Sequence, residues 1–153
     1  MAAYFFDSSA VVKRYVEEVG TSWVLGILNP DQKNHIYLAR ITGAEVVAAL
    51  ARKRRTGELP EADLSKTIQQ FRRDWKAIYR IVEVTSHIID RAMTLAEEES
   101  LRGYDAVQLA VALEVKSLTQ QKSGSGIYFV SADPALNDIA TKKGMQVKNP
   151  QSK

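Results

Sequence analysis

Short apolar runs alternate with longer segments of helical periodicity along the whole chain. The short runs, rich in aromatic and β-branched residues, predict buried strands at 3–6, 35–38, 80–84 and 127–130, with a possible last strand at 146–148. Helical periodicity with start and stop signals predicts helices at 10–15, 21–28, 40–56, 60–77, 86–100, 103–118 and 134–143. Residues 120–126, QQKSGSG, are expected to form a polar loop that a partner protein could contact. Strands that alternate with helices predict an α/β fold with a largely parallel sheet.

The chain of 153 residues shows no internal repeat, low-complexity segment or long linker. We therefore expect a single domain over residues 1–150, followed by a short tail at 151–153. No apolar segment approaches the roughly 20 residues of a membrane helix. The first residues, MAAYFFD, also lack the basic start of a signal peptide. A cytoplasmic protein without membrane contact is expected.

The composition limits the side chains that could bind a metal ion or act as a nucleophile. There is no cysteine, which excludes disulfides, thiolate zinc sites and cysteine nucleophiles. Only His35 and His87 could supply imidazole. The net charge of +3 is compatible with nucleic-acid binding without indicating it. Carboxylates thus become the main candidates for metal chemistry.

Asp7 and Glu45 stand out by their positions. Asp7 ends the first predicted strand, where ligands bind in parallel sheets, but it could equally cap the helix that follows. Glu45 is the one charge in the run AEVVAALA, on a helix whose apolar surroundings predict burial. A buried glutamate needs a partner or a metal ion. A salt bridge to Arg52, two helical turns away, is the alternative, and the spacing is long for such a pair.

Asp105 lies in the first turn of a predicted helix, and Asp133 immediately precedes another. Asp105 opens the apolar run DAVQLAVALEV, and favourable placement at a helix dipole would alone explain it. Asp133 precedes Pro134, a typical N-cap arrangement, although a carboxylate that caps a helix can still bind a second group. If all four acids converge at one edge of the sheet, their repulsion requires a hard divalent cation such as Mg²⁺ or Mn²⁺.

Four segments carry a family resemblance: YFFDSSAVVKRY at 4–15, TGAEVVAAL at 42–50, LRGYDAVQLAVAL at 101–113 and YFVSADPALNDIATKKGM at 128–145. With them the chain resembles the PIN-domain ribonucleases and, by its size, the VapC-like toxins of type II toxin–antitoxin systems. The resemblance implies a three-layer α/β/α sandwich around a central, mostly parallel sheet. It also implies that Mg²⁺ or Mn²⁺ is bound for RNA hydrolysis by a set of acids consisting of Asp7, Glu45, Asp105 and Asp133.

The same resemblance implies partners and supporting residues. Ser9 and Ser131 would orient the carboxylates. Such toxins commonly form homodimers and are silenced by a cognate antitoxin. A catalytically silent PIN-like binding module and a housekeeping RNA-processing nuclease stay open as alternatives. A haloacid-dehalogenase-like phosphatase is rejected, because it requires a second aspartate at the position of Ser9.

Basic residues concentrate in the middle of the chain. Residues 40–80 hold ten basic and five acidic side chains, a local excess of +5. The cluster formed by Arg52, Lys53, Arg54 and Arg55 could contact RNA phosphates or could simply be a solvated helix end whose cations favour the dipole. The sequence leaves both interpretations open.

Overall fold

The computed structural model describes residues 1–124 and 126–153, so residue 125 of the predicted loop lies outside the described residues. Five strands form one sheet in the order β3-β2-β1-β4-β5, and every neighbouring pair is parallel. The strands are β1 (Ala3–Phe6), β2 (His35–Ala39), β3 (Arg80–Val82), β4 (Tyr128–Val130) and β5 (Gln146–Lys148). This confirms the predicted α/β class and makes the sheet parallel throughout.

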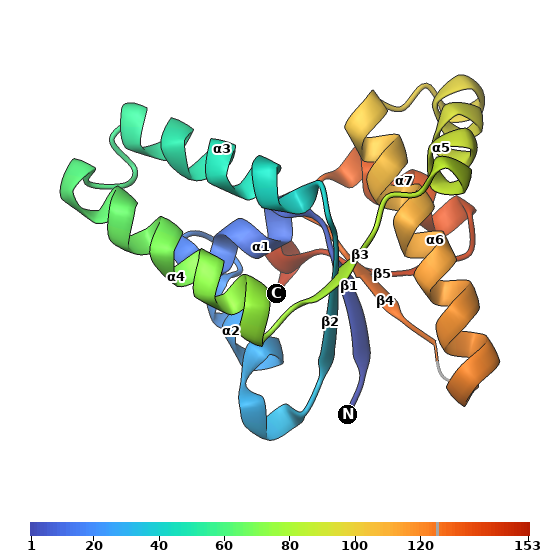
Figure 1. Cartoon of the computed structure of the whole chain (residues 1–153), viewed down its shortest axis with the longest axis horizontal. Coiled ribbons are helices and arrows are strands. Elements are labelled where there is room, and N and C mark those ends of the chain that lie inside the picture. The colour runs from blue at the N-terminus through green and yellow to red at the C-terminus, as the bar shows by residue number, and fades with distance from the viewer. Residues whose placement is uncertain (125) are drawn as a thin grey trace.

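Helices cover both faces of the sheet (Figure 1). One face carries α1 (Ser8–Tyr15), α2 (Thr21–Leu28), α3 (Thr42–Arg55) and α4 (Leu64–Ala77). The other face carries α5 (Ser86–Glu99), α6 (Gly103–Ser123) and α7 (Pro134–Lys142). The expected three-layer α/β/α sandwich is confirmed. Within the described chain, no helix is both long and apolar enough to cross a lipid bilayer.

Two hydrophobic cores fill the spaces between the layers, because alternate side chains of a strand point to opposite faces. Phe5 and Phe129 pack into the core under α5 and α6, with their rings stacked 5.9 Å apart. Phe6 and Val130 pack into the other core, together with residues of α1 to α4. The central strands are therefore apolar on both faces, which is why they appear as continuous apolar runs in the sequence.

The observed boundaries differ from the predicted ones at several helices, and the first helix and α6 show why. The first helix begins at Ser8 and not at residue 10, because Asp7 is its N-cap. The helix predicted to end at 118 continues to Ser123, so the loop prediction for 120–123 was wrong. Glutamine and lysine are good helix formers, and the first strong stop signal is Gly124, which adopts a positive φ of 69°.

Three short 3-10 helices are present: Pro30–Gln32, Glu61–Asp63 and Pro150–Ser152. The first and the last were not predicted, whereas Glu61–Asp63 forms the start of the helix predicted at 60–77, in which α4 begins only at Leu64. The last of the three crosses the boundary expected at residue 150. Pro150 is buried and approaches Gly20 so closely that a β-carbon at Gly20 would lie 2.6 Å from the Pro150 carbonyl oxygen. The end of the chain is thus packed against the start of α2, while the domain boundary itself stays a prediction.

Candidate active site

Asp7 lies at the carboxyl end of β1, the central strand, with β2 on one side and β4 on the other. This reversal of strand order is where open parallel sheets bind ligands. The carboxylate is 5% exposed, and its Oδ1 accepts hydrogen bonds from the Ala10 backbone N–H (3.1 Å) and the Ser9 hydroxyl (2.6 Å). Asp7 is therefore a helix cap and a buried charge at the edge of the sheet at once.

Glu45 sits in the first turn of α3 and is held from two sides. Its Oε1 accepts a hydrogen bond from Gln108 Nε2 (2.8 Å), and its Oε2 accepts one from the Ser8 hydroxyl (3.3 Å). The alternative ion pair with Arg52 does not form within the described residues. Burial is less complete than predicted, since Glu45 is half-buried and the helix exposes Ala48.

Asp105 occupies the first turn of α6 and is 7% exposed. Within the part of the chain that the structure describes, no residue donates a hydrogen bond to its carboxylate, so no hydrogen bond offsets the cost of burying this charge. Burial, helped by the negative charges of Asp133 and Asp7, raises the pKa of Asp105 to about 6, and Arg102 opposes this rise. The carboxylate is well placed to accept a cation.

Asp133 caps α7, as its position before Pro134 predicted. Its Oδ1 accepts hydrogen bonds from the backbone N–H groups of Ala135 (3.0 Å) and Leu136 (3.3 Å). Both capping bonds go to the same oxygen. The second oxygen of Asp133 is thus not used by the cap.

The four carboxylates lie in one electrostatic neighbourhood, which means that each interacts by its charge with at least one of the others. Burial, with a contribution from Asp133, raises the pKa of Asp7, and burial with contributions from Asp7 and Asp105 raises the pKa of Glu45. Among the described residues, however, no three histidine, aspartate or glutamate side chains stand close enough to form a ready-made metal cage. The four acids are therefore close enough to affect one another's pKa values, but they do not form a complete set of metal ligands among the described residues.

Two serines connect the loops that carry these acids. Ser9 donates to Asp7 and accepts a hydrogen bond from the Ala132 N–H (2.9 Å), which ties the end of β1 to the end of β4. Ser131 is fully buried, accepts from the Asp133 N–H (3.1 Å) and forms a hydrogen bond with Asp7 that lowers the pKa of that aspartate. Both serines contact the carboxylates, as expected.

A cavity of about 520 Å³ opens beside Glu45, between α1 and α3. Of the basic cluster, only Arg52 and Lys53 line it. Lys53 is paired with Glu18 (3.1 Å) and Glu58 (2.8 Å), whereas Arg52 forms no ion pair with any described residue. The cavity therefore combines a carboxylate with an unpaired guanidinium.

The sequence profile of the PIN domain matches residues 4–141. The chain belongs to the PIN domain family. Two relatives of this PIN domain, "Ribonuclease VapC45" of Mycobacterium tuberculosis strain CDC 1551 / Oshkosh and "Ribonuclease VapC49" of strain ATCC 25618 / H37Rv, are each 36% identical to it over 115 residues. The matched region is 75% of this chain and 78% of each relative. The resemblance seen in the four sequence segments is confirmed.

Solved structures share the PIN fold at low sequence identity. FitAB bound to an IR36 DNA fragment gives a TM-score of 0.68 at 13% identity, covering 97% of this chain and 95% of that one. A toxin–antitoxin complex from Klebsiella pneumoniae gives 0.63 at 19% identity, covering 96% and 97%. PAE2754 from Pyrobaculum aerophilum gives 0.61 at 18% identity, covering 99% and 85%. These matches support the fold.

The sequence analysis of this PIN domain did not single out Ser8, Thr42 and Gln108. Ser8 and Gln108 donate hydrogen bonds to Glu45, and Thr42 accepts one from Gln108. Gln108 is fully buried and donates to both Thr42 Oγ1 (2.7 Å) and Glu45. A signal for it existed, because it is the lone amide in the apolar run DAVQLAVALEV, three residues after Asp105. Ser8 and Thr42 carried no such signal, since hydroxyl residues are common at helix starts.

Proposed function

We propose that this PIN domain is an endoribonuclease that hydrolyses RNA phosphodiesters with Mg²⁺ or Mn²⁺ and serves as the toxin of a toxin–antitoxin pair. The main support is the gathering of Asp7, Glu45, Asp105 and Asp133 in one electrostatic neighbourhood at the edge of the sheet. Relatives named ribonuclease VapC, 36% identical over three quarters of the chain, support RNA as the substrate.

The donor atoms suit a hard divalent cation. Asp7, Glu45, Asp105 and Asp133 offer only carboxylate oxygens, the ligand type that Mg²⁺ and Mn²⁺ prefer. Their mutual repulsion would be relieved by a bound cation, which would draw them closer than they now lie. Such an ion, when bound, neutralises charge on a phosphodiester and helps to activate water.

The residues of the chain have separate tasks in the proposed reaction. Glu45, fixed by Ser8 and Gln108, orients the attacking water and accepts its proton. Asp7 is oriented by hydrogen bonds from Ser9 and the Ala10 N–H, both to Oδ1, and by Ser131. Attack of water on phosphorus with departure of the 3′-oxygen leaves a 5′-phosphate and a 3′-hydroxyl.

The proposal extends to partners. A cognate antitoxin protein would bind and silence the enzyme in the cytoplasm, as the toxin–antitoxin complex from Klebsiella pneumoniae, similar in fold over 96% of this chain, suggests by analogy. A homodimer is proposed from the family resemblance alone.

Cleavage assays on purified protein test the proposal. RNA should be cut in Mg²⁺ or Mn²⁺ and left intact in EDTA. Asp7→Asn and Glu45→Gln should each lower the rate by about 100-fold or more, because each removes a carboxylate of the site. Glu97→Gln, which neutralises an exposed glutamate on α5, is the matched control and should cleave at the parent rate. Cleavage that persists in EDTA, or in both site variants, contradicts the proposed site.

A growth assay separates the toxin role from the two alternatives. Induced expression in a bacterial host should stop growth, and Asp7→Asn should restore it. A housekeeping nuclease would cleave RNA without arresting growth. A silent binding module would show neither effect.

A further inference from the structure

Tyr104 differs from the other tyrosines of this protein. All six tyrosines are described, and five of them contact another ring, a cation or a hydrogen-bond partner. Tyr104 has no ring, cation or hydrogen-bond contact within the described chain and is 43% exposed. It is the only aromatic residue among the large exposed hydrophobic side chains of the described residues.

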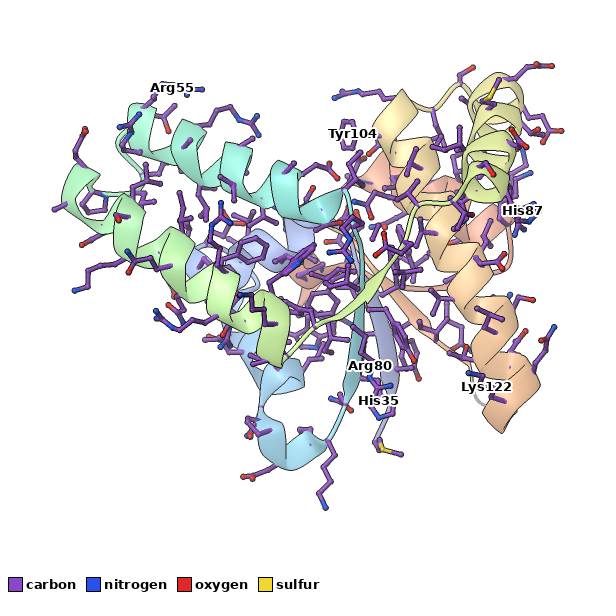
Figure 2. All side chains as sticks on the ribbon, viewed as in Figure 1. His35, Arg55, Arg80, His87, Tyr104 and Lys122 are labelled. Carbon is purple, nitrogen blue, oxygen red and sulfur yellow. The ribbon has the colours of Figure 1, made fainter. Side chains whose placement is uncertain are left out.

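The location of Tyr104 is as unusual as its exposure. It precedes Asp105 in the first turn of α6 and lines the same cavity as Ser8, Glu45 and Arg52. Figure 2 shows its side chain on the side of α6 that faces α3. Burial and the negative charges of Asp105, Glu45 and Asp7 raise the pKa of Tyr104, so its hydroxyl lies in the field of the same acids.

Arg52 supplies the complementary charge in this cavity. Its neighbours in the basic cluster are occupied: Lys53 binds Glu18 and Glu58, and Arg54 binds Glu61. Arg52 is exposed and forms no ion pair within the described residues. Lys13, at the same cavity, donates hydrogen bonds to Glu18 (3.0 Å) and the Val19 carbonyl (2.7 Å). An unpaired guanidinium and an unpaired aromatic ring thus flank one carboxylate, Glu45.

We propose that Tyr104 is the platform on which a nucleobase of single-stranded RNA stacks, and that Arg52 binds a phosphate of the same strand in the cavity. The inference rests on the proposed function for its choice of RNA. Proteins that bind single strands combine a cationic groove with exposed aromatic rings, because every base offers a π-face. A duplex would keep its bases stacked on one another, so the site favours single strands.

Binding, measured apart from cleavage, tests this inference. The full chain carrying Asp7→Asn is titrated, in Mg²⁺, into a fluorescent six-nucleotide uridine RNA and into the same ribose-phosphate chain without bases. Tyr104→Leu should weaken binding of the base-containing RNA by about 5- to 100-fold, the range seen when a stacking ring is removed. It should change binding of the base-free chain by less than twofold, and Tyr104→Phe should retain the parent affinity for both.

Arg52 has a different expected signature. Arg52→Ala should weaken both oligomers by similar factors and lower the slope of log affinity against log salt by about 0.7, the value for one phosphate contact on a single strand. Arg55→Ala is the matched control, because Arg55 is exposed on the same helix, is unpaired in the described chain and does not line the cavity. Figure 2 places it at the far end of α3. It should leave the slope unchanged.

The outcomes separate this inference from the proposed function. Equal affinity of the parent and Tyr104→Leu for the base-containing RNA overturns the stacking role, as does equal loss for both oligomers. Undetectable binding of both oligomers by the parent also overturns it. If the base-dependent loss is found but the wild-type protein cuts no RNA, the binding site stands and the nuclease proposal fails. Circular dichroism and gel analysis check that each variant is folded and each oligomer intact.

Discussion

At the scale of single residues, Gln108 illustrates how a buried amide can orient a carboxylate. Its Nε2 donates to Glu45 and to Thr42, and its Oε1 has no hydrogen-bond partner among the described residues. An unpaired buried carbonyl destabilises a folded protein, so this amide is held in place at a cost in stability. Gln108 is therefore a positioning residue for Glu45 and acts through that side chain.

Replacing Gln108 should separate activity from stability. Gln108→Leu should lower kcat by about 10-fold or more with little change in KM, because Glu45 loses its fixed orientation. The free energy of unfolding should fall by only about 1–3 kcal/mol, because Thr42 and Glu45 lose a donor while the unsatisfied Oε1 is also removed. RNA cleavage kinetics and urea unfolding measure the two effects. Gln69→Leu, an exposed change on α4, is the control. A parallel rise in KM would contradict the positioning role.

Asp105 should destabilise the metal-free protein. Its pKa is about 6 in the folded state and near 3.8 unfolded, so the folded state binds the proton more tightly. The penalty is absent below pH 4, grows as the pH rises to 6 and is complete above it. Asp105→Asn stays neutral and should be more stable by about 1–2 kcal/mol at pH 7.5, after allowance for solvent screening.

Urea unfolding in EDTA at pH 4 and pH 7.5 measures this difference. The advantage of Asp105→Asn should disappear at the lower pH. Equal stability of the parent and the variant at pH 7.5 would show that the buried charge is compensated by a group outside the proposed set.

The sequence singled out the four carboxylates by their positions taken together and by the family resemblance, and their shared role in one site stays a prediction. Asp7 and Asp133 follow apolar strands, and Glu45 and Asp105 interrupt or open apolar helices. Their partners could not be found in the same way. Ser8 and Thr42 contact the site only because α1, α3 and α6 meet there, and that meeting depends on tertiary packing.

At the scale of secondary-structure elements, the start of α7 carries two roles that can be separated. Asp133 caps the helix through Oδ1 and raises the pKa of Asp105 through its charge. Asparagine caps helices about as well as aspartate, whereas alanine does not. Asp133→Asn should therefore preserve the free energy of unfolding, while Asp133→Ala should lower it by about 1 kcal/mol.

Cleavage assays on the same pair complete the test. Both variants should lose activity if the charge of Asp133 contributes to the proposed site. Full activity in Asp133→Asn would leave Asp133 as a cap only.

The sequence predicted the type of each main helix and strand and the approximate position of its ends, because the apolar periodicity and the start and stop residues indicate the same segments. The exceptions have local causes. Gln120 and Lys122 extend α6 until Gly124 reverses the backbone, although polar residues after an apolar run suggested a loop. The 3-10 helix Pro150–Ser152 forms where buried Pro150 meets Gly20, a contact that no local pattern encodes.

At the scale of the whole molecule, the contact of Gly20 with Pro150 joins the end of the chain to α2. Gly20 has a φ of 94°, and a β-carbon there would lie 2.6 Å from the Pro150 carbonyl oxygen. Gly20→Ala should lower the free energy of unfolding by more than about 2 kcal/mol, because backbone strain and a backbone clash combine.

Gly57 offers a matched control for this prediction. Its φ is 82°, but a β-carbon there would meet nothing within 4 Å. Gly57→Ala should therefore show the conformational effect alone, about 1 kcal/mol. Urea unfolding compares the two variants. Similar losses would mean that the terminal 3-10 helix contributes nothing to stability.

The order of the strands in the sheet could not be predicted from the sequence. Alternating strands and helices predicted parallel pairing, but which strand lies at the centre depends on which face each helix covers. Here α1 to α4 cover one face and α5 to α7 the other, which puts β1 between β2 and β4.

The central place of β1 also bears on how the protein is made. One side of β1 pairs with β2, but residues 4–6 also pair with residues 128–130, so the other side of β1 stays unpaired until β4 has been synthesised. Contacts this distant in sequence form slowly and only after the intervening chain is available. Asp133 lies three residues beyond the end of β4. If the proposed four-acid site is required, a nascent chain is inactive until Asp133 has left the ribosome.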